Sequence, residues 1–158
     1  MQGFFYNPNI YPLAEYKLRR QAVVDMAKRL NMDVMYKDEN VGATLAVAQN
    51  KAVAPKGQGQ ALPLQNRCAN CWRMRLSEAA NAAKQEHSDV FSTTLLISPY
   101  QNHDEIRVIG RDLEESEKID FYYDDFRVGF RKSQQMAKDH GVYRQKYCGC
   151  QSSIKENK

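Results

Sequence analysis

The chain has 158 residues, a formal net charge of +4, and 42% hydrophobic and 27% charged residues. This length suits a single domain with a hydrophobic core, and no stretch approaches the roughly 20 apolar residues of a membrane span. The first residues lack the basic and apolar segments of a signal peptide. We therefore expect one domain over residues 1–158, in the cytoplasm and without a membrane partner. The mild positive charge is compatible with a polyanionic partner.

The amino-terminal part predicts a strand, a helix and a second strand. An apolar, aromatic run at residues 4–6 ends in Asn7-Pro8-Asn9, which is typical of a strand followed by a turn. Apolar residues at three- and four-residue spacing predict a helix from Pro12 to about residue 30. Residues 34–36 are the second predicted strand. Residues 41–66, rich in Ala, Gln, Gly and Lys, predict an irregular, loop-rich segment.

The remaining residues continue this alternation. Residues 68–87 predict a loop that enters a helix, and residues 90–97 predict a continuous β-branched strand buried on both faces. A helical spacing follows over residues 103–110. Residues 119–123 predict another strand, and residues 129–140 a helix that a glycine ends.

Alternating strands and helices indicate an α/β fold, in which helices flank a parallel sheet. Ligands of such open sheets bind beyond the carboxyl ends of the strands. Polar segments that begin at Asn7, Ser98 and Asp124 follow three of the predicted strands. We expect these segments to line one crevice.

The four cysteines form two close pairs, Cys68 with Cys71 and Cys148 with Cys150. In a cytosolic protein such pairs favour metal or redox chemistry over structural disulfides. The CxxC pair can hold one ion or one face of a cluster, whereas the CxC pair reaches two neighbouring metals more naturally. Spacing alone leaves zinc, an iron–sulfur cluster and redox-active thiols open.

The three histidines, His87, His103 and His140, fall at predicted helix ends or in loops. A surface or capping role is expected for each. His103 is the best functional candidate among them because it follows the strongest predicted strand.

Five blocks, in order along the chain, resemble the cobalamin-independent epoxyqueuosine reductases. Five ordered blocks are far more specific than a lone CxxC, and the match runs from residue 3 to about residue 153. The blocks are Phe4-Phe5-Tyr6-Asn7-Pro8-Asn9-Ile10-Tyr11-Pro12, Cys68-x-x-Cys71-Trp72-x-x-Arg75-Leu76, Phe91-Ser92-Thr93-Thr94-Leu95-Leu96-Ile97-Ser98-Pro99-Tyr100, Asp125-Phe126-Arg127-x-Gly129-Phe130 and Tyr143-Arg144-Gln145-Lys146-Tyr147-Cys148-Gly149-Cys150.

The resemblance implies a Rossmann-like domain of the adenine-nucleotide-hydrolase type. It also implies an oxidoreductase that reduces epoxyqueuosine at the wobble position of tRNA to queuosine, the last step of that modification. The cofactors implied are a 4Fe-4S cluster and an additional mononuclear iron, without cobalamin. An unidentified electron donor is a further expected partner.

Site residues follow from the same resemblance. Cys68, Cys71, Cys148 and Cys150 match the family's CxxC and CxC and are the expected metal ligands. Asp125 is the candidate proton donor or supporting carboxylate, with Tyr143 or Tyr147 as substitutes and a helix cap as the structural alternative. Candidate contacts to tRNA phosphates are Arg127, Arg131, Arg144 and Lys146, although charge alone favours solvated helix faces for these cations.

The chain departs from the family pattern at its start. The family's first strand and its Cys-Cys loop have no counterpart, so the domain is expected to be N-terminally incomplete. A longer natural chain, a genuine truncation, or a partner that supplies the missing strand and cysteines would each explain this. Besides the reductase, a zinc-stabilised RNA-binding module and an inactive truncated remnant stay open.

Overall fold

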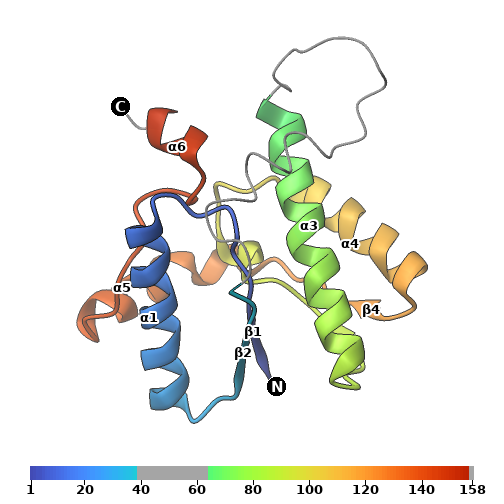
Figure 1. The fold of residues 1–158 in the computed structure, drawn as a ribbon, viewed down its shortest axis with the longest axis horizontal. Helices are drawn as coiled ribbons and strands as arrows, with labels where there is room; N and C mark the ends of the chain where they lie inside the picture. The colour runs from blue at the N-terminus through green and yellow to red at the C-terminus, as the bar shows by residue number, and fades with distance from the viewer. Residues whose placement is uncertain (39–63, 157–158) are drawn as a thin grey trace. The chain divides into compact units, whose positions relative to one another are not determined.

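The computed structural model describes residues 1–38 and 64–156 and divides into two compact units (Figure 1). Unit 1 comprises Met1–Gln60 and Ala137–Lys158, and unit 2 comprises Ala61–Met136. The irregular segment predicted at residues 41–66 lies outside the described residues except for its last three, which belong to a helix. The single domain over residues 1–158 stays a prediction.

Unit 1 begins with a strand–helix–strand unit. Strand β1 (Gly3–Phe5) pairs in parallel with β2 (Val34–Tyr36), and helix α1 (Leu13–Leu30) connects them. The helix ends at Asn31, which adopts a left-handed conformation with a φ of 47°. These elements confirm the two strands and the helix that the sequence predicts.

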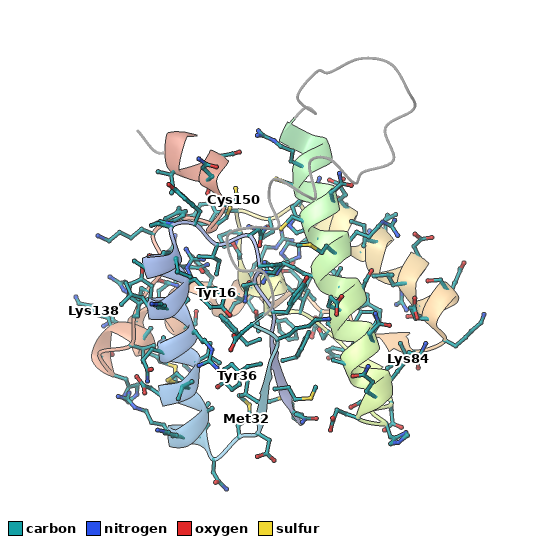
Figure 2. All side chains as sticks on the ribbon, viewed as in Figure 1. Tyr16, Met32, Tyr36, Lys84, Lys138 and Cys150 are labelled. Atoms are coloured by element: carbon teal, nitrogen blue, oxygen red, sulfur yellow. The ribbon has the colours of Figure 1, made fainter. Side chains whose placement is uncertain are left out.

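The core of unit 1 is small and aromatic. Phe5, Ile10 and Tyr16 are buried together, and Val34 and Tyr36 pack against them. Figure 2 labels Tyr16 on α1 and Tyr36 on β2. The carboxyl-terminal segment of the chain completes this unit and ends in a short helix, α6 (Gln151–Glu156).

Unit 2 contains a second parallel pair of strands, β3 (Val90–Phe91) and β4 (Asp120–Phe121). A 3₁₀ turn, η1 (Thr94–Ile97), and helix α4 (His103–Glu117) connect them. Helix α3 (Leu64–Gln85) precedes β3 and lies beside α4 (Figure 1). After β4 come a second 3₁₀ turn, η2 (Phe126–Gly129), and helix α5 (Phe130–Asp139), whose last residues belong to unit 1.

The larger hydrophobic core lies in unit 2. Leu76 and Ala80 of α3, Leu96 of η1 and Ile106 of α4 are buried almost completely in it. Gly110 of α4 lies directly against the ring of Phe121, because a Cβ atom at this position would stand 2.1 Å from Cδ1 of that ring. The glycine therefore allows α4 to approach β4 closely.

The prediction of a strand over residues 90–97 is wrong beyond Phe91, where β3 ends. The chain turns there, because the Thr93 hydroxyl accepts the N–H of Leu95 at 3.2 Å and caps η1. The turn carries Leu96 into the core. Val90 is 45% exposed, so the strand is not buried on both faces. A short apolar run cannot distinguish a strand from a buried turn by its pattern alone.

The α/β class is confirmed, because each of the two units contains a pair of parallel strands joined through a helix. A single Rossmann-like sheet stays a prediction. Among the helices in the described part of the chain, none combines the length and apolar character needed to cross a membrane.

Candidate metal-binding cysteines

Cys68 and Cys71 lie within helix α3, so the prediction of a loop at these residues is wrong. The helix begins at Leu64. Its burial pattern gives the reason: Trp72 and Leu76 are buried at helical spacing, and Ala69 packs against the same core one turn earlier. This stripe extends the helix back through the cysteines.

The helix places the Cys68 and Cys71 thiols on one face. Residues three apart are neighbours on a helix surface. Cys68 is exposed and Cys71 is partly buried. The indole of Trp72, between this pair and the core, donates to the Gln101 side chain at 2.9 Å and fixes the position of this turn.

Cys148 and Cys150 lie in the loop that enters α6, where Figure 2 labels Cys150. Their sulfur atoms are 3.6 Å apart. The Sγ atom of Cys148 is also 3.2 Å from the Ser153 hydroxyl. None of the four cysteines of the chain forms a disulfide.

The two loop thiols share one proton. A hydrogen bond from Cys148 lowers the pKa of Cys150 to about 5, against the opposing effect of burial. The same hydrogen bond and burial raise the pKa of Cys148 far above the ordinary thiol range. The first proton therefore leaves the pair easily, and the second is held between the sulfur atoms.

The spacing of the loop thiols fits one tetrahedral ion. Two thiolates that bind the same ion at about 2.3 Å stand about 3.8 Å apart, close to the 3.6 Å between these sulfur atoms. Thiolates are the ligands that zinc and iron–sulfur centres prefer. Among residues 1–38 and 64–156, no group of three or more His, Cys, Asp and Glu side chains is arranged to hold a metal ion. Each pair is thus a two-ligand site by itself.

Tyr143 and Tyr147 precede the loop thiols in the same segment. The Tyr143 hydroxyl donates to Glu15 at 2.5 Å, and burial together with this carboxylate raises its pKa to about 12. The Tyr147 hydroxyl donates to the Tyr11 carbonyl. The pKa of Tyr147 is raised mainly by burial and, to a smaller extent, by the negative charge of Glu15. Both phenols are protonated at neutral pH.

Tyr147 is also accessible to a ligand. It lines a hollow of about 450 Å³, together with Pro12 and Leu18 of unit 1 and Ile154 of α6.

Asp125 forms the cap of η2, which is the structural alternative that the sequence left open. Its Oδ1 atom accepts the backbone N–H of Arg127 at 3.1 Å, and its two oxygens accept from the Arg127 guanidinium at 2.7 and 2.5 Å. These hydrogen bonds lower the pKa of Asp125 to about 2. Asp125 is therefore a carboxylate at neutral pH.

The candidate phosphate contacts fall into two groups. Arg127 is paired with Asp125, so its charge is largely compensated. Arg131, Arg144 and Lys146 are exposed and form no ion pair with any other residue in the described part of the chain. Arg131 belongs to unit 2, whereas Arg144 and Lys146 belong to unit 1.

His103, the favoured histidine, begins α4 and is buried. Its ring nitrogens lie 3.4 Å from the Tyr123 hydroxyl and 3.3 Å from the Ser98 carbonyl oxygen. These contacts give His103 a packing role at the start of the helix.

The residues that hold the loop of Cys148 and Cys150 were not predicted from the sequence. Arg19 and Glu15 of α1 are buried charges that bond to this segment. A Glu and an Arg four residues apart are common on exposed helix faces, so their spacing alone did not indicate that these two side chains are buried. Ser153 could have been noticed as a hydroxyl three residues after Cys150.

The fold and the paired thiols define an α/β protein with cysteines suited to a soft metal. A family model described as "Epoxyqueuosine reductase QueH" matches residues 1–156. The chain belongs to this family.

Individual relatives carry the same name, "Epoxyqueuosine reductase QueH". The protein of Thermotoga maritima is 36% identical over 161 residues, which cover 98% of this chain and 80% of the relative. The protein of Helicobacter pylori is 30% identical, with 99% of this chain and 42% of the relative covered. For Staphylococcus epidermidis the identity is also 30%, with 93% and 63% covered. The chain thus spans less than two thirds of the length of two of these three relatives.

The shared proton of the loop thiols predicts a two-step titration in the metal-free protein. In a Cys68→Ala/Cys71→Ala background, which leaves only these two thiols, thiolate absorbance near 240 nm should rise once with a pKa near 5 and again only above the ordinary thiol range. Cys148→Ala removes the donor, so the first step should move up toward the ordinary value of about 8.5. Met74→Leu in the same background is the control and should leave that step unchanged. A first step that stays near 5 in Cys148→Ala would contradict the hydrogen bond as its cause.

Proposed function

We propose that this chain is an epoxyqueuosine reductase, a tRNA-modifying oxidoreductase that converts epoxyqueuosine at the wobble position to queuosine in the cytoplasm. Family membership over residues 1–156 carries the proposal. The paired thiols support it, because they supply the soft ligands that a redox metal centre needs. Removal of the epoxide oxygen takes two electrons and two protons, leaves an alkene and releases water. An electron donor of separate origin must supply the two electrons.

The metal ligands that we propose are Cys68, Cys71, Cys148 and Cys150, for a 4Fe-4S cluster and an additional iron, without cobalamin. Such centres supply single electrons and Lewis acidity. The 3.6 Å spacing of the Cys148 and Cys150 sulfur atoms favours joint chelation of one ion by that pair. Zinc fits the same spacing, so a zinc-stabilised RNA-binding module is the second candidate function.

Among the candidate proton donors, the phenols hold protons at neutral pH and Asp125 does not. Both hydroxyls already donate a hydrogen bond, Tyr143 to the buried Glu15 carboxylate and Tyr147 to the carbonyl of Tyr11, a residue that is 44% exposed. Tyr147 is next to Cys148 and lines the open hollow. We therefore propose that Tyr147 supplies a proton to the epoxide oxygen and that Asp125 acts as an ionised carboxylate that holds Arg127.

The four cationic residues are proposed contacts to tRNA phosphates. Arg131, Arg144 and Lys146 are exposed without a compensating carboxylate in the described residues, so each can replace a counterion on the RNA. Arg127 would contribute less, because a phosphate must compete with Asp125 for its guanidinium.

The metal assignment predicts the composition of the anaerobically isolated protein. We expect about four sulfides and four to five irons per chain, and nucleoside mass spectrometry should show that epoxyqueuosine in tRNA is converted to queuosine. Cys→Ser changes at each of the four cysteines should lower iron and sulfide content. Met74→Leu on α3 is the matched control and should retain both. A colourless protein with about one zinc, no sulfide and no turnover would favour the RNA-binding module instead.

The proton assignment predicts different losses for two variants. Tyr147→Phe should lower the turnover rate by about 10²- to 10⁴-fold, the usual contribution of general acid catalysis. Asp125→Asn should cost much less, because the acid form of Asp125 is scarce at neutral pH. Tyr122→Phe, at an exposed tyrosine of unit 2, is the control. The assignment is wrong if Asp125→Asn slows turnover as much as Tyr147→Phe does.

The phosphate contacts predict a change in salt dependence. Arg131→Gln, Arg144→Gln and Lys146→Gln should each weaken tRNA binding and reduce the slope of log K against log salt by about 0.7 to 0.9. Arg127→Gln should reduce the slope less. Lys28→Gln, at the exposed end of α1, should leave it unchanged. Slopes that equal the parent's in all four variants would rule out these residues as the RNA contacts.

A further inference from the structure

Arg19 of α1 bonds to the loop of Cys148 and Cys150 in several places at once. It is only 8% exposed. Its Nη2 atom donates to the Tyr147 carbonyl at 2.8 Å, and Nη1 donates to the Cys148 carbonyl at 3.0 Å. Nη1 also donates to the Gln145 side chain at 2.8 Å. One planar guanidinium thus fixes the backbone directly before the second thiol.

The charge of Arg19 is compensated on the other side of the guanidinium. Its Nε atom donates to Glu15 at 2.7 Å, and both side chains of this pair are almost fully buried. The second oxygen of Glu15 accepts from the Tyr143 hydroxyl. Because Glu15 neutralises the guanidinium, Arg19 acts on the loop mainly by fixing the position of its backbone, and adds little net positive charge there.

The glycine between the two cysteines fits closely against the same guanidinium. Gly149 has a φ of +118°, a conformation that side-chain-bearing residues rarely adopt. A Cβ atom there would lie 3.0 Å from Nη1 of Arg19 and 3.0 Å from Cγ1 of Ile10. The Gly149 carbonyl accepts the N–H of Tyr11 at 2.8 Å. Three consecutive residues of the loop are therefore held, 147 and 148 by Arg19 of α1 and 149 by Tyr11, which precedes the helix.

We propose that Arg19 is a positioning residue that presets the Cys148 and Cys150 thiols to chelate one soft metal ion. The inference rests on the proposed function, which makes these two thiols metal ligands. Bonds to the carbonyls of Tyr147 and Cys148 restrain the backbone that carries the two thiols, whose sulfur atoms lie 3.6 Å apart in contact with each other. A preorganised pair binds more tightly because less conformational freedom is lost on binding.

The test uses Co²⁺ binding to the full chain under anaerobic conditions. A Cys68→Ala/Cys71→Ala background leaves Cys148 and Cys150 as the only thiols, and the thiolate-to-cobalt charge-transfer band reports their coordination. Arg19→Lys keeps the charge but loses the planar fork, whereas Arg19→Gln loses both. We expect both variants to bind Co²⁺ about 10- to 100-fold more weakly than the parent, the usual effect of removing a group that orients a ligand. Arg20→Lys, at the neighbouring residue paired with Asp38, should match the parent.

A second variant that retains the fold is needed, because Arg19→Gln leaves the buried Glu15 carboxylate without a cation. Glu15→Gln/Arg19→Met removes both charges together. Folded proteins often tolerate the replacement of both members of a buried ion pair. With a circular dichroism spectrum like the parent's, the double variant should show the same weakening and less charge-transfer absorption per bound cobalt.

Two results would overturn the inference in distinguishable ways. Parent-like affinity in Arg19→Lys and the double variant would refute the role of Arg19 alone, because the parent would still show thiolate binding. Absence of the thiolate–cobalt band in the parent would refute the assignment of Cys148 and Cys150 as metal ligands, and the proposed function would lose that support.

Discussion

The attachment of the carboxyl-terminal loop in unit 1 depends on the buried guanidinium of Arg19. Charged groups are seldom buried unless they are paired and hydrogen-bonded, and Arg19 meets both conditions through Glu15 and the carbonyls of residues 147 and 148. The helix that crosses between β1 and β2 thereby also holds the carboxyl-terminal loop. Two segments more than 120 residues apart in the sequence are tied together by contacts that neither segment could make alone.

The two cysteine pairs differ in the way the chain presents them. Cys68 and Cys71 lie on a long helix whose position the packing of Trp72 and Leu76 determines. Cys148 and Cys150 lie in a loop with little regular structure, so their geometry depends on side-chain hydrogen bonds from α1 and on the backbone freedom of Gly149. A rigid helix and a clamped loop are two ways to restrain the distance between paired thiols.

The chemistry of Asp125 and Arg127 depends on the ion pair that they form with each other. Arg127 and Asp125 neutralise each other and cap a turn, although a count of residues would register a cation and an acid available for function. The pairing changes the chemistry of both groups. It holds Asp125 in its ionised form and reduces the attraction of Arg127 for phosphate, whereas the protons available near Cys148 and Cys150 reside on tyrosines that burial keeps neutral.

The sequence by itself determined the family, the α/β class and the positions of β1, α1 and β2, because ordered motifs and local periodicity are properties of neighbouring residues. The tertiary structure alone decided three things. It ended β3 at Phe91 and formed a turn at residues 94–97 that carries Leu96 into the core, since Thr93 supplies a cap that hydrophobicity does not encode. It extended α3 through Cys68 and Cys71, because the burial of Trp72 and Ala69 favours a helix there. It also brought Arg19 to the loop of Cys148 and Cys150, where the guanidinium bonds to two backbone carbonyls, since this contact between distant segments forms only on folding.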